Sequence, residues 1–203
     1  MAGFSDCKPD AAVLARARRG DMKAHEALYG SYSRPAYTLA LRILADAALA
    51  DEVLQDTAME VMRNIGAVRH DAAFGGWVKR IATNKCLAYL RSAWHRKGEH
   101  LAPEAEADAE SSAGERFGSD DLATRTADRE SLERALASLS PTARAVVWLY
   151  DVEGYSHREI GALMGKSVSF SKSSLARAHE QLRASLGPDY TEVSTCMPRP
   201  SNF

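Results

Sequence analysis

The sequence predicts an all-α protein built from two small helical domains. Apolar residues recur every three to four positions over most of the chain, which is the spacing of a helix that buries one face, whereas strand-like alternation is hard to find. A polar, acidic stretch with few large apolar groups separates two helical blocks. We therefore predict helical domains at residues 1–97 and 129–186, a flexible acidic linker at 98–128, and a loose tail at 187–203.

Composition indicates a cytoplasmic protein without cofactors or metals. The three cysteines, Cys7, Cys86 and Cys196, are far apart and lack metal-ligand spacing, so free thiols in a reducing compartment are expected. The N-terminus has no apolar signal-peptide core, and no apolar run approaches the ~20 residues that a membrane helix needs. We expect a soluble protein with no membrane insertion.

Four helices are expected in the first block. In "ARRGD", Gly20 ends one helix and Asp21 caps the next, and Asp46 can cap a third. Pro35 predicts a kink or a break in the second helix. A loop at residues 66–73 precedes a fourth helix, at about 74–97. The face of the second helix predicted to be buried comprises Leu28, Tyr32, Ala36, Leu39 and Ile43; that of the third comprises Leu49, Val53, Ala58, Val61 and Ile65.

Charge is segregated between the third and fourth helices. The third carries an outward stripe of Glu52, Gln55, Asp56 and Met59 beside Asp51, which is either a solvated face or a docking surface for a basic partner. Residues 79–97 hold six lysines and arginines and no acid. One basic face is often only solvated, but a long helix without balancing acids favours a nucleic-acid contact. Arg80, Asn84, Arg91 and His95 lie on that face.

The second block contains a helix, a glycine turn and a helix in "YSHREIGALMGKSVSFSKSSLARAHEQLR". Gly161 is expected where the helices cross, Gly165 in the turn, and Ser167 or Ser169 at the start of the second helix. This pattern predicts a helix-turn-helix, whose second helix enters the major groove of DNA. Gly165-Lys166-Ser167 also ends many phosphate-binding loops. However, Gly161 lies one residue too close and the preceding segment is helical, which argues against an ATP-dependent enzyme.

The chain resembles bacterial sigma factors of the extracytoplasmic-function (group IV) type over roughly residues 11–97 and 130–186. "DEVLQDTAMEVMRNI" is similar to the family's D-x-x-x-Q-[DE] region, and "FGGWVKRIATNKCLAYLRSAWHRK" to its F-x-x-W-[LV]-x-R-I-A-x-N stretch. "SLSPTARAVVWLYDVEGYSHREIGALMG" is similar to the family's fourth region. The residues that match the second stretch are Phe74, Trp77, Arg80, Ile81, Ala82, Asn84, Leu90 and Arg91.

The resemblance implies a factor that binds core RNA polymerase and promoter DNA and is not an enzyme. It also implies an anti-sigma factor or another regulatory protein as a partner, and no small-molecule substrate. Contacts to the clamp helices of the largest polymerase subunit would come from Asp51, Glu52, Gln55 and Asp56. Contacts to the minus-ten element would come from Val68, Arg69, His70, Lys79, Arg80, Asn84 and Arg91. Contacts to the minus-thirty-five element would come from Ser169, Phe170, Lys172, Ser173 and Arg177.

The recognition helix departs from the family pattern. Lys166 and Ser171 stand at inward positions that are usually apolar, and Ser174 replaces the usual arginine. We therefore expect a helix that is loosely held in the free protein, and one that Ser171→Val would stabilise. An alternative function is a stand-alone helix-turn-helix regulator whose first block senses a ligand or dimerises. The basic fourth helix argues against it, because a sensor does not need one.

Overall fold

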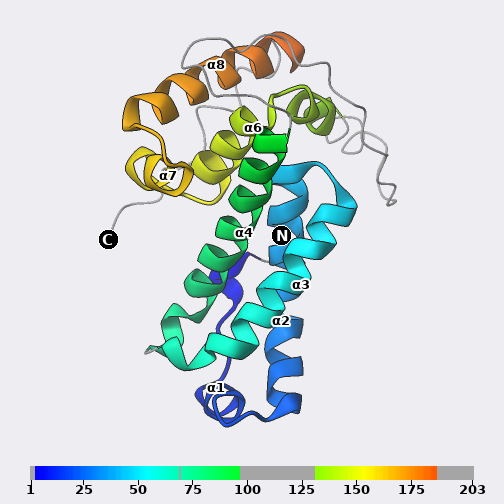
Figure 1. Cartoon of the computed structure of the whole chain (residues 1–203), viewed down its shortest axis with the longest axis vertical. Helices are drawn as coiled ribbons and strands as arrows, with labels where there is room; N and C mark the ends of the chain where they lie inside the picture. The colour runs from blue at the N-terminus through cyan, green and yellow to red at the C-terminus, as the bar shows by residue number, and fades with distance from the viewer. Residues whose placement is uncertain (1–2, 69, 97–130, 187–203) are drawn as a thin grey trace. The chain divides into compact units, whose positions relative to one another are not determined.

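The structure, a computed structural model, describes residues 3–68, 70–96 and 131–186, and all regular elements in these ranges are helical. The chain separates into two compact units, residues 1–100 and 101–203 (Figure 1). The predicted all-α class with two helical domains is confirmed. The linker at 98–128 and the tail at 187–203 lie outside the described residues, so their boundaries stay predictions.

The N-terminal unit is built on three long helices that pack against one another. A short helix, α1, packs on α2, and two single turns connect α3 to α4 (Figure 1). The elements are η1 (Phe4–Asp6), α1 (Ala11–Ala17), α2 (Met22–Leu44), α3 (Ala47–Asn64), η2 (Ile65–Ala67), η3 (Asp71–Ala73) and α4 (Phe74–Arg96).

Aspartate side chains start α1, α2 and α3. Asp10 accepts from the Ala12 N–H at 2.9 Å, Asp21 from the Lys23 N–H at 2.9 Å, and Asp46 from the Leu49 N–H at 2.9 Å. Each carboxylate satisfies an amide that has no partner within its helix. Between α1 and α2 the chain turns at Gly20, whose φ of 85° suits glycine. The helix stop and start predicted at "ARRGD" are thus confirmed.

The apolar stripe of α2 forms the centre of this unit. All five residues predicted on its inner face are buried. Tyr32, 2 % exposed, packs its ring 6.2 Å from that of Phe74 at the start of α4. On α3 the prediction is wrong at two positions: Ala50 and Thr57 are fully buried, whereas the predicted Leu49 and Ala58 are half-buried. The other three predicted residues, Val53, Val61 and Ile65, are buried.

Of the kink or break predicted at Pro35, the break is wrong, because α2 continues through Pro35 from Met22 to Leu44. Proline has no N–H, so the Ser31 carbonyl loses its usual helical donor. The Cys7 thiol donates to that carbonyl at a sulfur–oxygen distance of 3.1 Å. Cys7 is buried, and the pKa of its thiol is raised by burial and then by Asp6. The thiol is thus kept protonated as a donor by the N-terminal segment, which substitutes for the missing helical bond.

The same N-terminal segment fits closely against α4. A side chain at Gly75 would collide with the Phe4 carbonyl and approach the Cys7 carbonyl to 3.1 Å. Phe4 itself is 6 % exposed. Gly75 is therefore required by the close approach of two backbones rather than by a turn.

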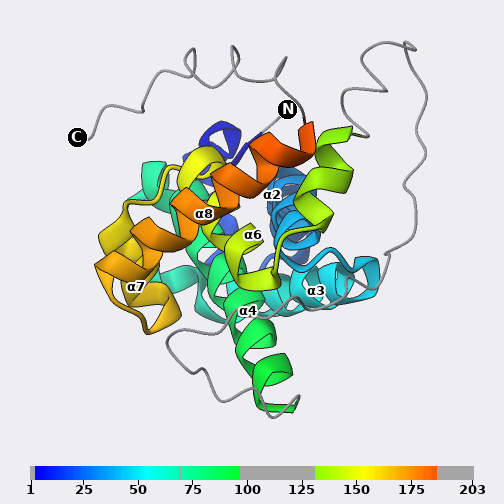
Figure 2. The same cartoon turned by 90° about the horizontal axis from the view of Figure 1, so that it is seen from above.

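The C-terminal unit consists of short helices crossed by one long helix. Residues 131–137 are helical, and α6 (Pro141–Val147) continues into the π-helical η4 (Trp148–Val152). Then α7 (His157–Met164) and α8 (Val168–Leu186) follow, and α8 packs on both α6 and α7 (Figures 1 and 2). The largest apolar side chains buried in this core are Leu139, Val146, Val147, Leu149, Ile160, Met164 and Leu175.

The hydrogen bond from Cys7 predicts a thermodynamic coupling with Pro35. Cys7→Ala should lower the free energy of unfolding, because it leaves the part-buried Ser31 carbonyl without this donor. In a Pro35→Ala background the new N–H can satisfy that carbonyl, so the cost of Cys7→Ala should fall by about 1 kcal/mol. Urea denaturation of the four proteins measures the coupling, and equal costs of Cys7→Ala in both backgrounds would contradict it.

Candidate nucleic-acid interface

Helices α7 and α8 form the predicted helix-turn-helix. The Ser156 Oγ accepts from the Glu159 N–H at 3.3 Å while Glu159 accepts from the Ser156 N–H at 2.8 Å, so a capping box starts α7. Gly165 ends α7 with a φ of 67°. The Ser167 Oγ then accepts from the Phe170 N–H at 3.1 Å and starts α8, so Ser167 is the cap rather than Ser169.

Gly161 lies under the turn that joins the two helices. A Cβ at this position would lie 2.9 Å from the Lys166 carbonyl oxygen, which real Cβ atoms do not approach so closely. The Lys166 N–H also donates to the Gly161 carbonyl at 2.8 Å. Gly165-Lys166-Ser167 is therefore a tight turn between helices, and it lacks the preceding strand that a phosphate loop needs.

One face of α8 carries the residues predicted to meet the upstream DNA element. Ser169, Lys172, Ser173 and Arg177 are exposed, and Phe170 is half-exposed. Lys166 is half-buried, and its Nζ lies 5.7 Å from the centre of the Phe170 ring. This cation–π contact holds the two side chains together at the start of α8.

The polar residue at the inward position of α8 has a hydrogen-bond partner on α7. Ser171 is fully buried, as the helical register predicts, and its Oγ lies 3.0 Å from His157 Nδ1. The His157 ring stacks on Tyr150, with 4.4 Å between ring centres. The expectation that Ser171→Val stabilises this unit is therefore revised, because valine would remove the hydrogen-bond partner of His157.

The protonation state of His157 is linked to the stability of this unit. Burial lowers the pKa of His157, Lys172 lowers it further, and Asp151 opposes them. A histidine whose folded pKa lies below its ordinary value favours folding in its neutral form. That contribution is complete above pH ~6.5 and is lost as the pH falls.

A second histidine ties α8 to the π-helical turn. His179 Nε2 lies 2.7 Å from Asp151 Oδ2, and both side chains are about one-third exposed. Sequence reasoning missed both histidine contacts. Their partners lie 14 and 28 positions away, so no helical spacing could have signalled them.

The acidic side chains predicted on α3 share one outward face. Asp51, Glu52 and Gln55 are exposed, and Asp56 is half-exposed. Glu52 accepts a hydrogen bond from the Tyr89 hydroxyl of α4 at 2.9 Å, which is the main reason that the pKa of Tyr89 is raised to about 12. Two exposed methionines, Met59 at 47 % and Met62 at 43 %, continue this face. The surface can therefore offer a partner both charge and apolar area.

The basic side chains of α4 lie opposite its buried stripe of Val78, Ala82 and Cys86. Arg80, Asn84 and Arg91 are exposed and Lys79 is half-exposed. Lys85 instead faces α3, where its Nζ lies 3.8 Å from Glu60. The predicted basic face is thus present along α4 as far as its side chains are described. The side chain of His95 lies outside that part.

The residues predicted as DNA contacts in the loop before α4 differ in exposure. Val68 is 5 % exposed, so its side chain packs inward, while His70 is exposed. Arg69 lies outside the described residues. The Arg18 guanidinium at the end of α1 holds this loop: its Nη2 donates to the Val68 carbonyl at 2.9 Å and to Asp71 Oδ1 at 2.8 Å.

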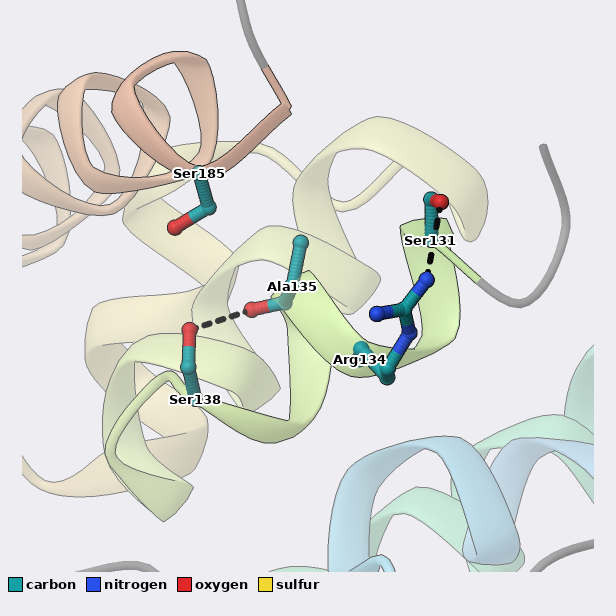
Figure 3. A pocket seen from close by; sticks show the side chains of 5 residues that line it. All are labelled: Ser131, Arg134, Ala135, Ser138 and Ser185. Atoms are coloured by element: carbon teal, nitrogen blue, oxygen red, sulfur yellow. Dashed lines mark hydrogen bonds between the residues drawn. The ribbon is translucent and has the colours of Figure 1, made fainter. Parts of the chain in front are cut away.

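A shallow hollow of about 220 Å³ lies in the C-terminal unit (Figure 3). Arg134 donates to Ser131 at 3.2 Å, Ser138 to the Ala135 carbonyl at 2.7 Å, and Ser185 to the Gln181 carbonyl at 2.9 Å. Each of these bonds stays within one helical turn. We read them as local helix contacts and assign the hollow no ligand.

In the described ranges, no three histidine, cysteine, aspartate or glutamate side chains cluster so that they could hold a metal ion. Within the same ranges, no helix combines the length and the apolar character that crossing a membrane requires.

The chain is similar to known proteins over both units. The family profile "Sigma-70 region 2" matches residues 28–96, and "Sigma-70, region 4" matches residues 129–182. ECF RNA polymerase sigma factor SigM of Mycobacterium tuberculosis (strain ATCC 25618 / H37Rv) is 32% identical over 183 residues, covering 89% of this chain and 86% of that protein. RNA polymerase sigma factor CarQ of Myxococcus xanthus is 32% identical over 181 residues, covering 89% of this chain and 99% of that protein.

A solved structure shares the fold. The sigma factor RpoE, crystallised with the anti-sigma factor NepR from Bartonella quintana, matches 83% of this chain and 98% of its own with a TM-score of 0.51. At 22% identity this likeness concerns the fold alone. The two family profiles occur in the chain order that the sequence motifs predict.

The His157 contact predicts opposite effects for two buried serines of α8. Ser171→Ala should lower the free energy of unfolding of the C-terminal unit by about 1 kcal/mol, because a paired hydroxyl is lost. Ser174→Ala is the matched control. The Ser174 hydroxyl is buried without a hydrogen-bond partner among the described residues, so its loss should be neutral or stabilising.

The measurement is urea denaturation of the full chain, followed through the NMR signal of the Trp148 indole in this unit. Equal effects of Ser171→Ala and Ser174→Ala would show that the contact with His157 contributes no stability.

Proposed function

Because the chain belongs to the extracytoplasmic-function (ECF) family of RNA polymerase sigma factors, we propose that its two units divide the recognition of one promoter between them. It acts as an alternative sigma factor that binds core RNA polymerase and directs promoter-specific initiation of transcription. One observation carries the division. The region 2 profile falls on the unit with the acidic α3 and basic α4, and the region 4 profile falls on the helix-turn-helix.

The acidic face of α3 is the proposed docking surface for core polymerase. Its partner would be the clamp helices of the largest subunit, with basic side chains that complement Asp51, Glu52 and Asp56 and a polar contact to Gln55. The exposed Met59 and Met62 support this assignment, since protein interfaces combine an apolar centre with charged groups that steer association.

The loop before α4 and the outer face of α4 are the proposed contact for the minus-ten element. Promoter melting requires a base to leave the stack, which costs a few kcal/mol and is offset by stacking and backbone contacts. The exposed His70 offers a ring for stacking, and Arg80 and Asn84 offer donors. The full proposed set is Val68, Arg69, His70, Lys79, Arg80, Asn84 and Arg91; Val68 would act through its backbone, because its side chain is buried.

The exposed face of α8 is the proposed contact for the minus-thirty-five element in the major groove. Lys172 and Arg177 would contact phosphates, and Phe170 would contact a thymine methyl group. Ser169 and Ser173 complete the set. Their exposure on one face of α8 supports this assignment.

A regulatory partner is also proposed. RpoE, which shares this fold, was crystallised with the anti-sigma factor NepR. We expect an anti-sigma protein to compete with core polymerase for this chain, within the cytoplasm. No catalytic role is proposed for any residue. The alternative, a stand-alone helix-turn-helix regulator, is not favoured, because region 2 is matched over residues 28–96.

The direct test is to combine the purified chain with core polymerase and to map the transcripts that it starts. Transcripts sharing one pair of upstream elements would support the proposal. Transcripts identical to those of core enzyme alone would contradict it.

Charge reversal on α3 should separate docking from folding. Asp51→Arg with Asp56→Arg should abolish binding to core polymerase, because two attractions become repulsions of roughly 1.4 kcal/mol or more each. Helicity should be unchanged, because both side chains point outward. Titration with fluorescently labelled core enzyme measures the affinity.

The matched control for a single reversal is Glu180→Arg, an exposed acid on α8 outside the docking surface. Core binding that falls as much with Glu180→Arg as with Asp51→Arg would move the docking surface away from α3.

Lys172 and Phe170 should have different effects on upstream recognition by the holoenzyme. Lys172→Ala should weaken binding about equally across promoter sequences and reduce the salt slope by about 1, because one phosphate contact is lost. Phe170→Ala should change which upstream sequence is preferred. Binding to a promoter library randomised upstream, at several salt concentrations, measures both, and a sequence-dependent effect of Lys172→Ala would reverse the two roles.

A further inference from the structure

Arg18 lies outside the region 2 profile, which begins at residue 28, yet it reaches the loop that precedes α4. Its backbone is fixed at the end of α1, where the Arg18 N–H donates to the Leu14 carbonyl at 3.0 Å. Leu14 and Ala17 are buried and anchor α1 in the unit. The following turn is held by a 2.7 Å ion pair between Arg16 and Asp21. Arg18 therefore projects from a well-anchored support.

The Arg18 guanidinium binds the loop on both sides of His70. One nitrogen, Nη2, donates to the Val68 carbonyl at 2.9 Å and to Asp71 Oδ1 at 2.8 Å. The loop is further shaped by the Val68 N–H, which donates to the Ile65 carbonyl at 3.2 Å, and by the Ala73 N–H, which donates to the His70 carbonyl at 2.9 Å. His70 is exposed between these fixed points.

This contact differs from an ordinary surface ion pair, which contributes little to stability. The bond to the Val68 carbonyl holds the backbone at that residue and not only the position of a side chain. The Arg18 side chain is 29% exposed and that of Asp71 is 37% exposed. A loop whose path is fixed before binding loses less conformational entropy when it captures a ligand.

We propose that Arg18 is a positioning residue that presents His70 to the melted minus-ten element. This inference rests on the proposed function of the loop. It adds that the loop depends on α1, because Arg18 at the end of α1 holds the loop in place. Arg18 acts through the loop and makes no DNA contact of its own. Its loss therefore lowers the discrimination between minus-ten sequences without weakening the binding of core polymerase.

The test uses holoenzyme reconstituted from core polymerase and the full chain, on a promoter library randomised in the minus-ten element. Arg18→Ala should reduce the ratio of open complexes on preferred and non-preferred sequences by about tenfold. The reason is that roughly one more loop residue must then be ordered when the loop captures a preferred base. The salt slope and the affinity for core enzyme should stay unchanged. Arg19→Ala is the matched control, because this neighbouring arginine is also exposed and carries the same charge.

Asp71→Ala distinguishes positioning from a direct phosphate contact by Arg18. If Arg18 positions the loop, Asp71→Ala removes one of its two bonds and lowers discrimination in the same direction. If Arg18 instead binds phosphate, Asp71→Ala frees it and strengthens binding, and Arg18→Ala lowers binding on all sequences with a salt slope reduced by about 1. Stronger binding in Asp71→Ala overturns the proposal, and so does a uniform loss of binding with a reduced salt slope in Arg18→Ala. An effect of Arg18→Ala no larger than that of Arg19→Ala overturns it as well. If Arg18→Ala does not fold, Asp71→Ala decides by the same criteria.

His70→Ala separates this inference from the proposed function. If His70→Ala lowers minus-ten discrimination and Arg18→Ala does not, the positioning role fails and the function of the loop stands. If His70→Ala leaves discrimination unchanged, the assignment of the loop to the minus-ten element fails, and the role of Arg18 fails with it.

Discussion

Burial of the apolar stripe of α2 is the constraint on which the N-terminal unit depends. The large side chains of this stripe pack against the inner faces of α3 and α4, and Tyr32 packs against Phe74 of α4. The remaining faces of α3 and α4 meet water and are mostly polar, with Met59 and Met62 as exposed apolar exceptions on α3. The acidic face of one helix and the basic face of the other are therefore displayed on a rigid three-helix support. Surfaces that bind polymerase or DNA benefit from such a support, since little order has to be created on binding.

Contacts from distant parts of the chain complete this support. The Cys7 thiol replaces the helical donor that Pro35 lacks, and Arg18 fixes the loop before α4. Both groups come from the first eighteen residues, which precede the matched family region. The N-terminal segment thus contributes to the shape of the surfaces that α2, α3 and α4 present, although it carries none of the proposed polymerase or DNA contacts.

In the C-terminal unit, a pair of polar side chains joins α7 to α8. An inward serine on a recognition helix would leave a buried hydroxyl unpaired, which costs stability. Here His157, stacked on Tyr150, lies at hydrogen-bond distance from Ser171. The pair joins α7 to α8 at the position where an apolar contact was expected. The side of α8 that is proposed to face DNA thus lies on a helix joined to α7 by a polar contact, and that contact is linked to pH through His157.

The sequence by itself determined the helical class, the capped starts of the helices, the glycine turn and the segregation of charge. These features follow from spacing along one helix and from the chemistry of single caps, which are local properties. Only the tertiary structure decided that α2 runs through Pro35, that Thr57 replaces Ala58 in the core, and that Ser171 pairs with His157. It also decided that Arg18 reaches Val68, 50 positions away. These outcomes depend on which groups from different helices meet, and helical periodicity carries no information about partners in other helices.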